Sequence, residues 1–168
     1  MMTRQQQFGV VSLAMAKPRW LDEREQRVWQ GYLHLNQDLI AVLEQQLARE
    51  SGLSGADYRV LHPLSEAPGG LLRARDLGSD IGWDRSRLSH HLSRMEKRGL
   101  VTREECAEDA RGLMVRLTKA GRRAIEEAAP GHVEAVRRYF FDQLSKDEID
   151  TMAAVFDRVL DNLRRKKA

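Results

Sequence analysis

The side chains with the clearest chemistry lie between residues 84 and 98, a stretch rich in short polar and basic residues. On a helix, at about 100° per residue, Leu88, Leu92 and Met95 would share one face, as is typical of a face packed on a core. The remaining surface would carry side chains that can bond to bases and phosphates: Arg85, Ser86, Arg87, Ser89, His90, Ser93, Arg94 and Lys97. The stretch therefore predicts a DNA-reading helix, with an ordinary solvated polar face as the alternative.

A second candidate is the string Asp109-Ala110-Arg111-Gly112. It ends a polar segment, residues 105–112, that separates two strand-like runs at 100–104 and 114–118 and predicts the loop of a hairpin. An arginine at the tip of such a loop can enter a minor groove, where narrow DNA concentrates negative potential. Asp109 can hold that guanidinium in place. The alternative is an ordinary turn with a surface ion pair worth about 0 to 1 kcal/mol.

Residue types that serve catalysis or metal binding are not grouped in this sequence. It contains no glycine-rich phosphate loop, no nucleophile elbow and no Cys/His set at metal-ligand spacing. Of the five histidines only His90 and His91 are adjacent, and neighbours on a helix point about 100° apart. We therefore expect no catalytic residues, no metal, no cofactor and no enzymatic activity. The single cysteine, Cys106, cannot form an internal disulfide, which favours a reducing, cytoplasmic location.

The elements that must position these residues are mostly helices. Residues 21–50 contain no proline, start with acidic side chains and end before Gly52, which predicts one long helix with a wide apolar face. A capping box at 54–57 opens a second helix, which ends at 68–70, and a short helix follows at 72–79. After a turn at Gly82, Asp84 caps the DNA-reading helix, which ends at Arg98 and in which His91 is expected to pack or cap. This order is typical of a helix-turn-helix, and the hairpin adds a wing.

The C-terminal third predicts two further helices. Residues 119–144 form one, with Thr118 as its cap and a kink or break at Pro130-Gly131. The other opens with a capping box at 145–148 and repeats apolar residues at spacings of three and four. Because the terminal helices carry more apolar surface than a small domain covers, we expect a homodimer, with a monomeric bundle as the alternative.

Composition agrees with a fold that is mainly α with a small β-hairpin. The chain has 168 residues, 42% hydrophobic and 32% charged, and no apolar run near the roughly 18 residues of a membrane span. Residues 71–123 hold 13 basic against 8 acidic side chains, whereas the remainder holds 15 against 17, so the positive charge gathers in the winged part. We expect a flexible tail at 1–20, a dimerisation helix at 21–52, a winged helix-turn-helix domain at 53–118 and dimerisation helices at 119–168.

Three strings make a resemblance to a known family specific. They are residues 83–89 with their continuation Arg94-Met95-Glu96-Lys97-Arg98-Gly99-Leu100-Val101, the Asp109-Ala110-Arg111 wing, and Leu117-Thr118-Lys119-Ala120-Gly121. Together they resemble the MarR family of bacterial transcriptional regulators over about residues 21–163. The resemblance implies a homodimer that binds a pseudo-palindromic operator in double-stranded DNA, often a repressor released by a small aromatic molecule. It implies groove and phosphate contacts by Arg85, Ser86, Arg87, Ser89, His90 and Arg94, and a wing contact by Arg111 that Asp109 positions.

The same resemblance implies an effector cleft between the long first helix, the helix that opens at 54–57 and the helix after the wing. Trp29, Tyr32 and His62 are the candidates there, with ordinary core or surface roles as the alternative. Oxidant sensing by a cysteine near the first helix does not transfer, because Cys106 lies in the wing. Two other functions stay open: a DNA-binding regulator without a ligand, and a helical dimer that binds a partner other than DNA.

Overall fold

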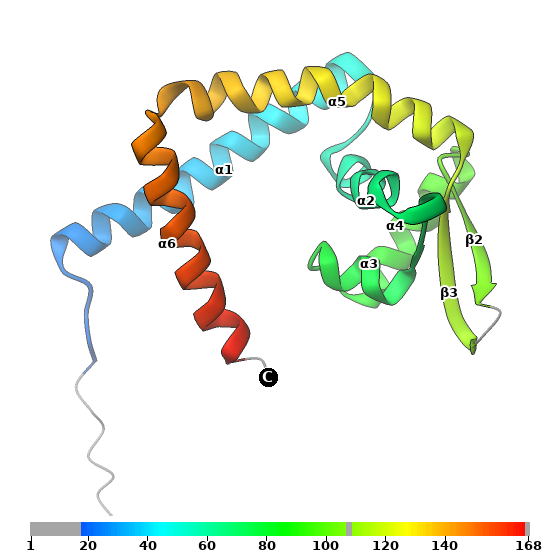
Figure 1. Ribbon diagram of the computed structural model, residues 1–168, viewed down its shortest axis with the longest axis horizontal. Coiled ribbons are helices and arrows are strands. Elements are labelled where there is room, and N and C mark those ends of the chain that lie inside the picture. Colours follow the sequence, from blue (N-terminus) through cyan, green and yellow to red (C-terminus); the bar gives the residue numbers. More distant parts are fainter. Residues whose placement is uncertain (1–17, 107–108, 167–168) are drawn as a thin grey trace, which may run out of the picture. The chain divides into compact units, whose positions relative to one another are not determined.

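The computed structural model describes residues 18–106 and 109–166 and is mainly helical (Figure 1). Its helices are α1 (Glu23–Ser51), α2 (Gly55–Glu66), α3 (Ala74–Asp80), α4 (Arg85–Lys97), α5 (Lys119–Tyr139) and α6 (Lys146–Arg165), with short 3-10 turns η1 (Pro68–Gly70) and η2 (Phe141–Gln143). The strands are β1 (Leu71–Arg73), β2 (Val101–Cys106) and β3 (Asp109–Leu117). The expected fold class is confirmed. Two compact units are distinguished, one up to Leu35 and one from Asn36 onward.

Four helices begin at the caps that the sequence predicts. Ser54 accepts a hydrogen bond from the Asp57 amide at 3.0 Å while the Asp57 carboxylate accepts one from the Ser54 amide at 2.9 Å. Ser145 and Glu148 form the same reciprocal pair before α6. Asp84 caps α4 and Thr118 caps α5, each accepting an amide hydrogen bond at 2.9 Å. These bonds satisfy donors that helix starts leave unpaired, so the boundaries are decided locally.

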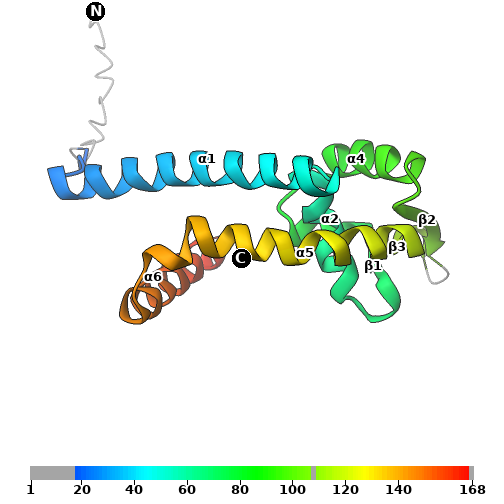
Figure 2. The same cartoon turned by 90° about the horizontal axis from the view of Figure 1, so that it is seen from above.

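The sheet has one strand more than the predicted hairpin. Its order is β1-β3-β2 and all pairs are antiparallel, with Leu71 opposite Arg116 on β3 (Figure 2). The prediction that a helix begins at residue 72 is wrong, since α3 begins at Ala74. Three residues are too few to show a period of two, and they become a strand only because β3 offers a free edge to pair with.

The hairpin loop is shorter than the predicted 105–112. Strand β2 continues to Cys106 and β3 starts at Asp109, with an irregular register at Glu105 and Cys106. Asp109 and Arg111 therefore lie in a strand and not at a loop tip, which corrects the sequence interpretation. The pairing extends because backbone groups opposite each other in a hairpin satisfy one another whatever the polarity of their side chains. The side chains of residues 106–111 lie outside the described part of the structure.

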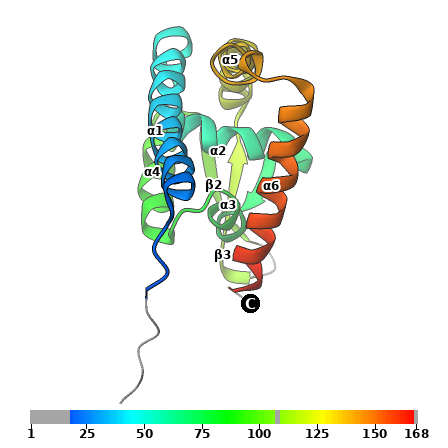
Figure 3. The same ribbon diagram turned by 90° about the vertical axis from the view of Figure 1, so that its left-hand side faces the viewer.

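One apolar core holds the winged unit together. Leu88, Leu92 and Met95 of α4 are buried, as predicted, and pack with side chains from α2, α3, the strands and α5. Figure 3 shows α2 lying across β2 and β3 within this unit. Gly121 in the first turn of α5 faces the Leu100 carbonyl so closely that an added Cβ would lie 2.0 Å from its oxygen. The α5 start is thus pressed against the start of β2, which fixes the base of the wing.

Helix α5 passes through Pro130 and Gly131 without a break, so of the two outcomes expected there, a kink or a break, the break is wrong. Gly131 lies beside the last turns of α1, where an added Cβ would be 3.0 Å from Glu50 Oε2 and 3.2 Å from Gln46 Nε2. Close packing of α5 on these turns accounts for the continuity, because tertiary contacts can outweigh the cost of one lost helical hydrogen bond.

Large apolar side chains remain exposed along α6 and the N-terminal part of α1. On α6 they are Val155, Phe156, Val159, Leu160 and Leu163, and no described residue of α6 is buried. On α1 and just before it they include Trp20, Val28, Trp29, Tyr32, Leu33 and Leu35. Scattered apolar residues are normal on a surface, but a full helical stripe marks an interface. Within the described ranges no helix combines the length and apolarity that a membrane span requires.

Candidate nucleic-acid interface

Helix α4 exposes the face that the sequence singles out. All six predicted contact residues on it are exposed: Arg85, Ser86, Arg87, Ser89, His90 and Arg94. Lys97 is exposed as well, whereas Leu88, Leu92 and Met95 point to the core. The sequence therefore assigned the exposed and the buried face of α4 correctly. An exposed helix start with arginine and serine donors on one face matches what a major groove offers as acceptors.

Trp83, immediately before the cap of α4, supports two of its side chains. The Arg87 guanidinium lies 4.4 Å from the centre of the Trp83 ring, within the range of a cation–π contact. The same ring meets His91 edge-on, with centroids 5.3 Å apart. Trp83 is absent from the sequence-based list of site residues. Its signal is an aromatic residue directly before a helix cap, a position that can pack under the first turn.

A cavity of about 450 Å³ lies between α3, α4 and the wing. We call it the basic groove, because Arg73, Arg75 and Arg85 line it together with Trp83, Ser89 and Gly112. Two residues predicted from the sequence, Arg85 and Ser89, thus share one hollow with two arginines that sequence reasoning missed. Arg73 and Arg75 come from β1 and the first turn of α3, and only the pairing of β1 with β3 brings them beside α4.

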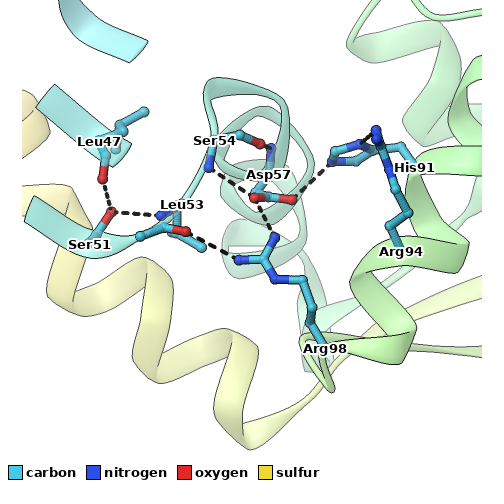
Figure 4. A network of polar contacts seen from close by, with 9 residues as sticks. Leu47, Ser51, Leu53, Ser54, Asp57, His91, Arg94 and Arg98 are labelled. Atoms are coloured by element: carbon cyan, nitrogen blue, oxygen red, sulfur yellow. Dashed lines mark hydrogen bonds and ion pairs between the residues drawn. The ribbon is translucent and has the colours of Figure 1, made fainter. Parts of the chain in front are cut away.

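A network of buried polar groups lies beneath α4 (Figure 4). Asp57 of α2 is 2% exposed and accepts a hydrogen bond from Arg98 at 2.7 Å. His91 is 5% exposed; its Nε2 lies 3.1 Å from the second Asp57 oxygen, an ion-pair distance without the alignment of a good hydrogen bond. Its Nδ1 lies 2.9 Å from the guanidinium of Arg94. The prediction that His91 packs is confirmed, and the network itself was not foreseen.

The groups around Asp57 stabilise the ionised form of its carboxyl group. Burial alone would raise the pKa of Asp57, but the close contact with His91 and the hydrogen bonds from Arg98 and Ser54 more than offset it and hold that pKa far below its ordinary value. Arg98 also donates to the Gly52 carbonyl at 3.3 Å, just after α1. One carboxylate thus connects the start of α2 with α4.

Two further ion pairs stiffen the wing. Arg103 of β2 donates to Glu96 of α4 through Nε at 2.9 Å and through a terminal nitrogen at 2.6 Å. This hydrogen bonding lowers the pKa of Glu96. Across the hairpin, Arg116 forms a two-point contact with Glu104. Bidentate pairs of this kind fix orientation, so the base of the wing is held to α4.

A second cavity, of about 270 Å³, lies between the C-terminal half of α1, α2 and α5. We call it the helical cavity. Its lining is Ile40, Leu43, Glu44, Leu47, Gly55, Tyr58, Arg59, His62 and His132. The rings of Tyr58 and His132 lie 4.3 Å apart, and burial, with a smaller effect of His62, lowers the pKa of His132. Apolar walls with a few polar groups are typical of small-molecule sites.

The three predicted effector residues lie in different parts of the structure. His62 lines the helical cavity. Trp29 and Tyr32 belong to the first unit, where they stack on each other at 5.7 Å and remain half exposed. Their part in an effector site stays a prediction. Tyr58 and His132 were missed, although Tyr58 precedes His62 by one helical turn and so shares its face.

Comparisons with known proteins agree with this geometry. Residues 51–112 match the sequence profile of the MarR family. The structure is similar to that of AbsC, a MarR family transcriptional regulator from Streptomyces coelicolor, with 37% identity and a TM-score of 0.83 over 88% of this chain and 99% of AbsC. It is also similar to a second MarR family transcriptional regulator of that organism, solved in complex with DNA, with 38% identity and a TM-score of 0.84 over 88% and 92% of the two chains.

A more distant relative has been solved with its ligand bound. The PcaV transcriptional regulator from Streptomyces coelicolor, solved in complex with its natural ligand, shares 25% identity and a TM-score of 0.69 over 84% of this chain and 96% of its own. These relatives are transcriptional regulators and not enzymes.

Proposed function

Because the chain belongs to the MarR family of transcriptional regulators, we propose that it binds a pseudo-palindromic operator as a homodimer and represses the adjacent genes. The observation that carries this proposal is the exposed face of α4. Arginines, serines and a histidine lie on this face, whereas Leu88 and Leu92 on the other face are buried. Each protomer would place this face in a major groove, with Arg85, Ser86, Arg87, Ser89, His90 and Arg94 as contacts.

The exposed apolar stripes on α1 and α6 support the proposed dimer. A two-fold association would bury them, and it would set two α4 helices one turn of DNA apart. In this arrangement residues 21–52 and 119–168 form the dimerisation layer and residues 53–118 bind DNA. The monomeric bundle would have to leave five large apolar side chains of α6 in water.

The wing supplies the second DNA contact of each protomer. In our proposal Arg111 enters the minor groove beside the α4 site, and Asp109 orients its guanidinium. The Arg103–Glu96 pair supports this role, because it holds β2 to α4 and so sets the reach of the wing relative to the major-groove contacts.

We further propose that a small aromatic molecule in the helical cavity releases the protein from DNA. The cavity is lined by α2, where Asp57, which contacts His91 of α4, directly precedes the cavity residue Tyr58. A ligand that shifts α2 would therefore shift the support of α4. The second candidate function, a regulator without a ligand, is favoured if aromatic carboxylates and phenols leave DNA binding by the wild type unchanged.

The test of the DNA-binding proposal is selection of a randomised duplex library by the purified protein at about 0.15 M salt, where non-specific phosphate binding is weak. We expect enrichment of an inverted repeat with half-sites about one helical turn apart. Ser86→Glu, which places a negative charge on the exposed face of α4, should abolish enrichment and leave the circular dichroism spectrum unchanged. Recovery of no sequence above background by the wild type would refute the proposal.

A further inference from the structure

We propose that His91, buried on the core-facing side of α4 beside Asp57, is a positioning residue that orients Arg94 for its contact with DNA. The inference rests on the proposed function and extends it to a residue that touches no DNA. It starts from one chain of contacts in Figure 4, which runs from Asp57 of α2 through the His91 ring to the Arg94 guanidinium.

The hydrogen-bonding capacity of the three groups allows one arrangement. A carboxylate only accepts and a guanidinium only donates. The ring nitrogen that faces Asp57, Nε2 at 3.1 Å, must therefore carry the proton, and the nitrogen that faces Arg94, Nδ1 at 2.9 Å, must present its lone pair. The Nε2–H tautomer turns its proton toward Asp57 and its lone pair toward Arg94. With the proton on Nδ1, two donors would face each other and Arg94 would lose its acceptor.

Asp57 is anchored well enough to impose this tautomer. Its carboxylate is held by the Ser54 amide and by the guanidinium of Arg98, in addition to the contact with His91. The edge-on contact with Trp83 holds the His91 ring from another side. Because Asp57 and His91 are both nearly buried, neither can turn to water for an alternative partner.

Arg94 is exposed at the surface of α4, where a long side chain would otherwise sample many rotamers. Binding DNA would then have to order this side chain at a cost in conformational entropy, and prior ordering by His91 removes part of that cost. A guanidinium carries five N–H donors, so the contact with one ring nitrogen leaves donors for a phosphate or base.

The experiment compares two substitutions of His91, each of which keeps one of its two polar contacts. Asn places an amide oxygen near the position of Nδ1 and can accept from Arg94, whereas Gln reaches the position of Nε2 and can donate to Asp57. Binding to the inverted repeat recovered by selection is measured by fluorescence anisotropy at fixed salt, for folded dimers only. We expect His91→Gln to bind about tenfold more weakly than the wild type, as the ordering cost at two Arg94 side chains implies, and His91→Asn to stay within about threefold.

A double-mutant cycle separates positioning from a structural role. In an Arg94→Ala background, His91→Gln should cause less than a twofold further loss, because the side chain through which His91 acts is gone. An equal loss in both backgrounds, or equal affinities of the Gln and Asn variants, would overturn the proposal. If the variants do not fold, ¹⁵N NMR of the wild type decides: the Nε2–H tautomer of His91 is expected, and the Nδ1–H tautomer would refute it. Failure of the wild type to bind any repeat would refute the proposed function instead.

Discussion

Arg111 is the single residue on which the wing contact of the proposed complex depends. It lies in β3 two positions after Asp109, in a hairpin whose base is held to α4 by Arg103 and Glu96. We predict that Arg111→Ala weakens operator binding at least tenfold, about 1.4 kcal/mol, because the minor groove attracts a cation that alanine cannot supply. Arg24→Ala, which removes the same charge from α1, should have little effect. Anisotropy titrations give both values, and unchanged affinity of the Arg111 variant would exclude the wing from binding.

His90 and Lys97 lie two turns apart on the exposed face of α4. Their substitution by alanine should change DNA binding in different ways. His90→Ala is expected to relax sequence preference, since a base-edge contact is lost. Lys97→Ala is expected to weaken all sequences alike, because a phosphate contact carries no sequence information. Competition between the selected repeat and its single-base variants distinguishes these results. Equal loss of specificity in both variants would mean that the face of α4 turned to the bases is not the one proposed.

Asp57 makes stability depend on pH. Its pKa in the folded chain lies below the ordinary value of 3.8, so the carboxylate contributes stability above about pH 4 that is lost as pH falls toward the folded pKa. Asp57→Asn should therefore reduce the free energy of unfolding at pH 7 by roughly 1 to 3 kcal/mol, with the difference from the wild type shrinking below pH 4. Urea denaturation at several pH values measures this, with the exposed Asp38→Asn as control. A difference that persists unchanged below pH 4 would contradict the assignment.

At the scale of elements, the closest approach in the winged unit joins the start of α5 to the start of β2. Gly121→Ala would put a Cβ about 2.0 Å from the Leu100 carbonyl oxygen. Because this oxygen belongs to the backbone, the clash can be relieved only if α5 or β2 moves. We predict a loss of about 2 kcal/mol or more in the free energy of unfolding, together with weaker DNA binding because the wing starts at β2. Gly31→Ala, with open space around it on α1, should not destabilise the protein. Chemical denaturation of both variants is the measurement, and equal stabilities would contradict the packing.

For the whole molecule, the decisive property is self-association. Phe156 is 48% exposed on α6, in the stripe that we propose is buried between protomers. Phe156→Glu should produce a monomer in sedimentation velocity and abolish tight binding to the repeat, since one half-site supplies only part of the affinity. Asp157→Lys, a charge change at the neighbouring position, should remain dimeric. A monomeric wild type at micromolar concentration would remove the homodimer from the mechanism.

The sequence alone predicts those features that depend on interactions between residues close together in the chain. Ser54, Asp84, Thr118 and Ser145 start helices because their side chains bond to amides three residues on, and the apolar spacing of Leu88, Leu92 and Met95 orients α4 toward the core. Both signals act over one or two turns, so they can be recognised in a linear string. From them follow the winged helix-turn-helix order and the exposed contact face.

Tertiary contacts determined the remaining features. Strand β1 exists because β3 has an edge for it, α5 continues through Pro130 because α1 packs beside it, and β3 extends past Arg111 because β2 lies opposite. Arg73 and Arg75 reach the basic groove only through that sheet, and Asp57 meets His91, 34 positions later in the sequence, only when the core closes. Such pairings depend on which surfaces meet in space, and no local propensity or spacing encodes them.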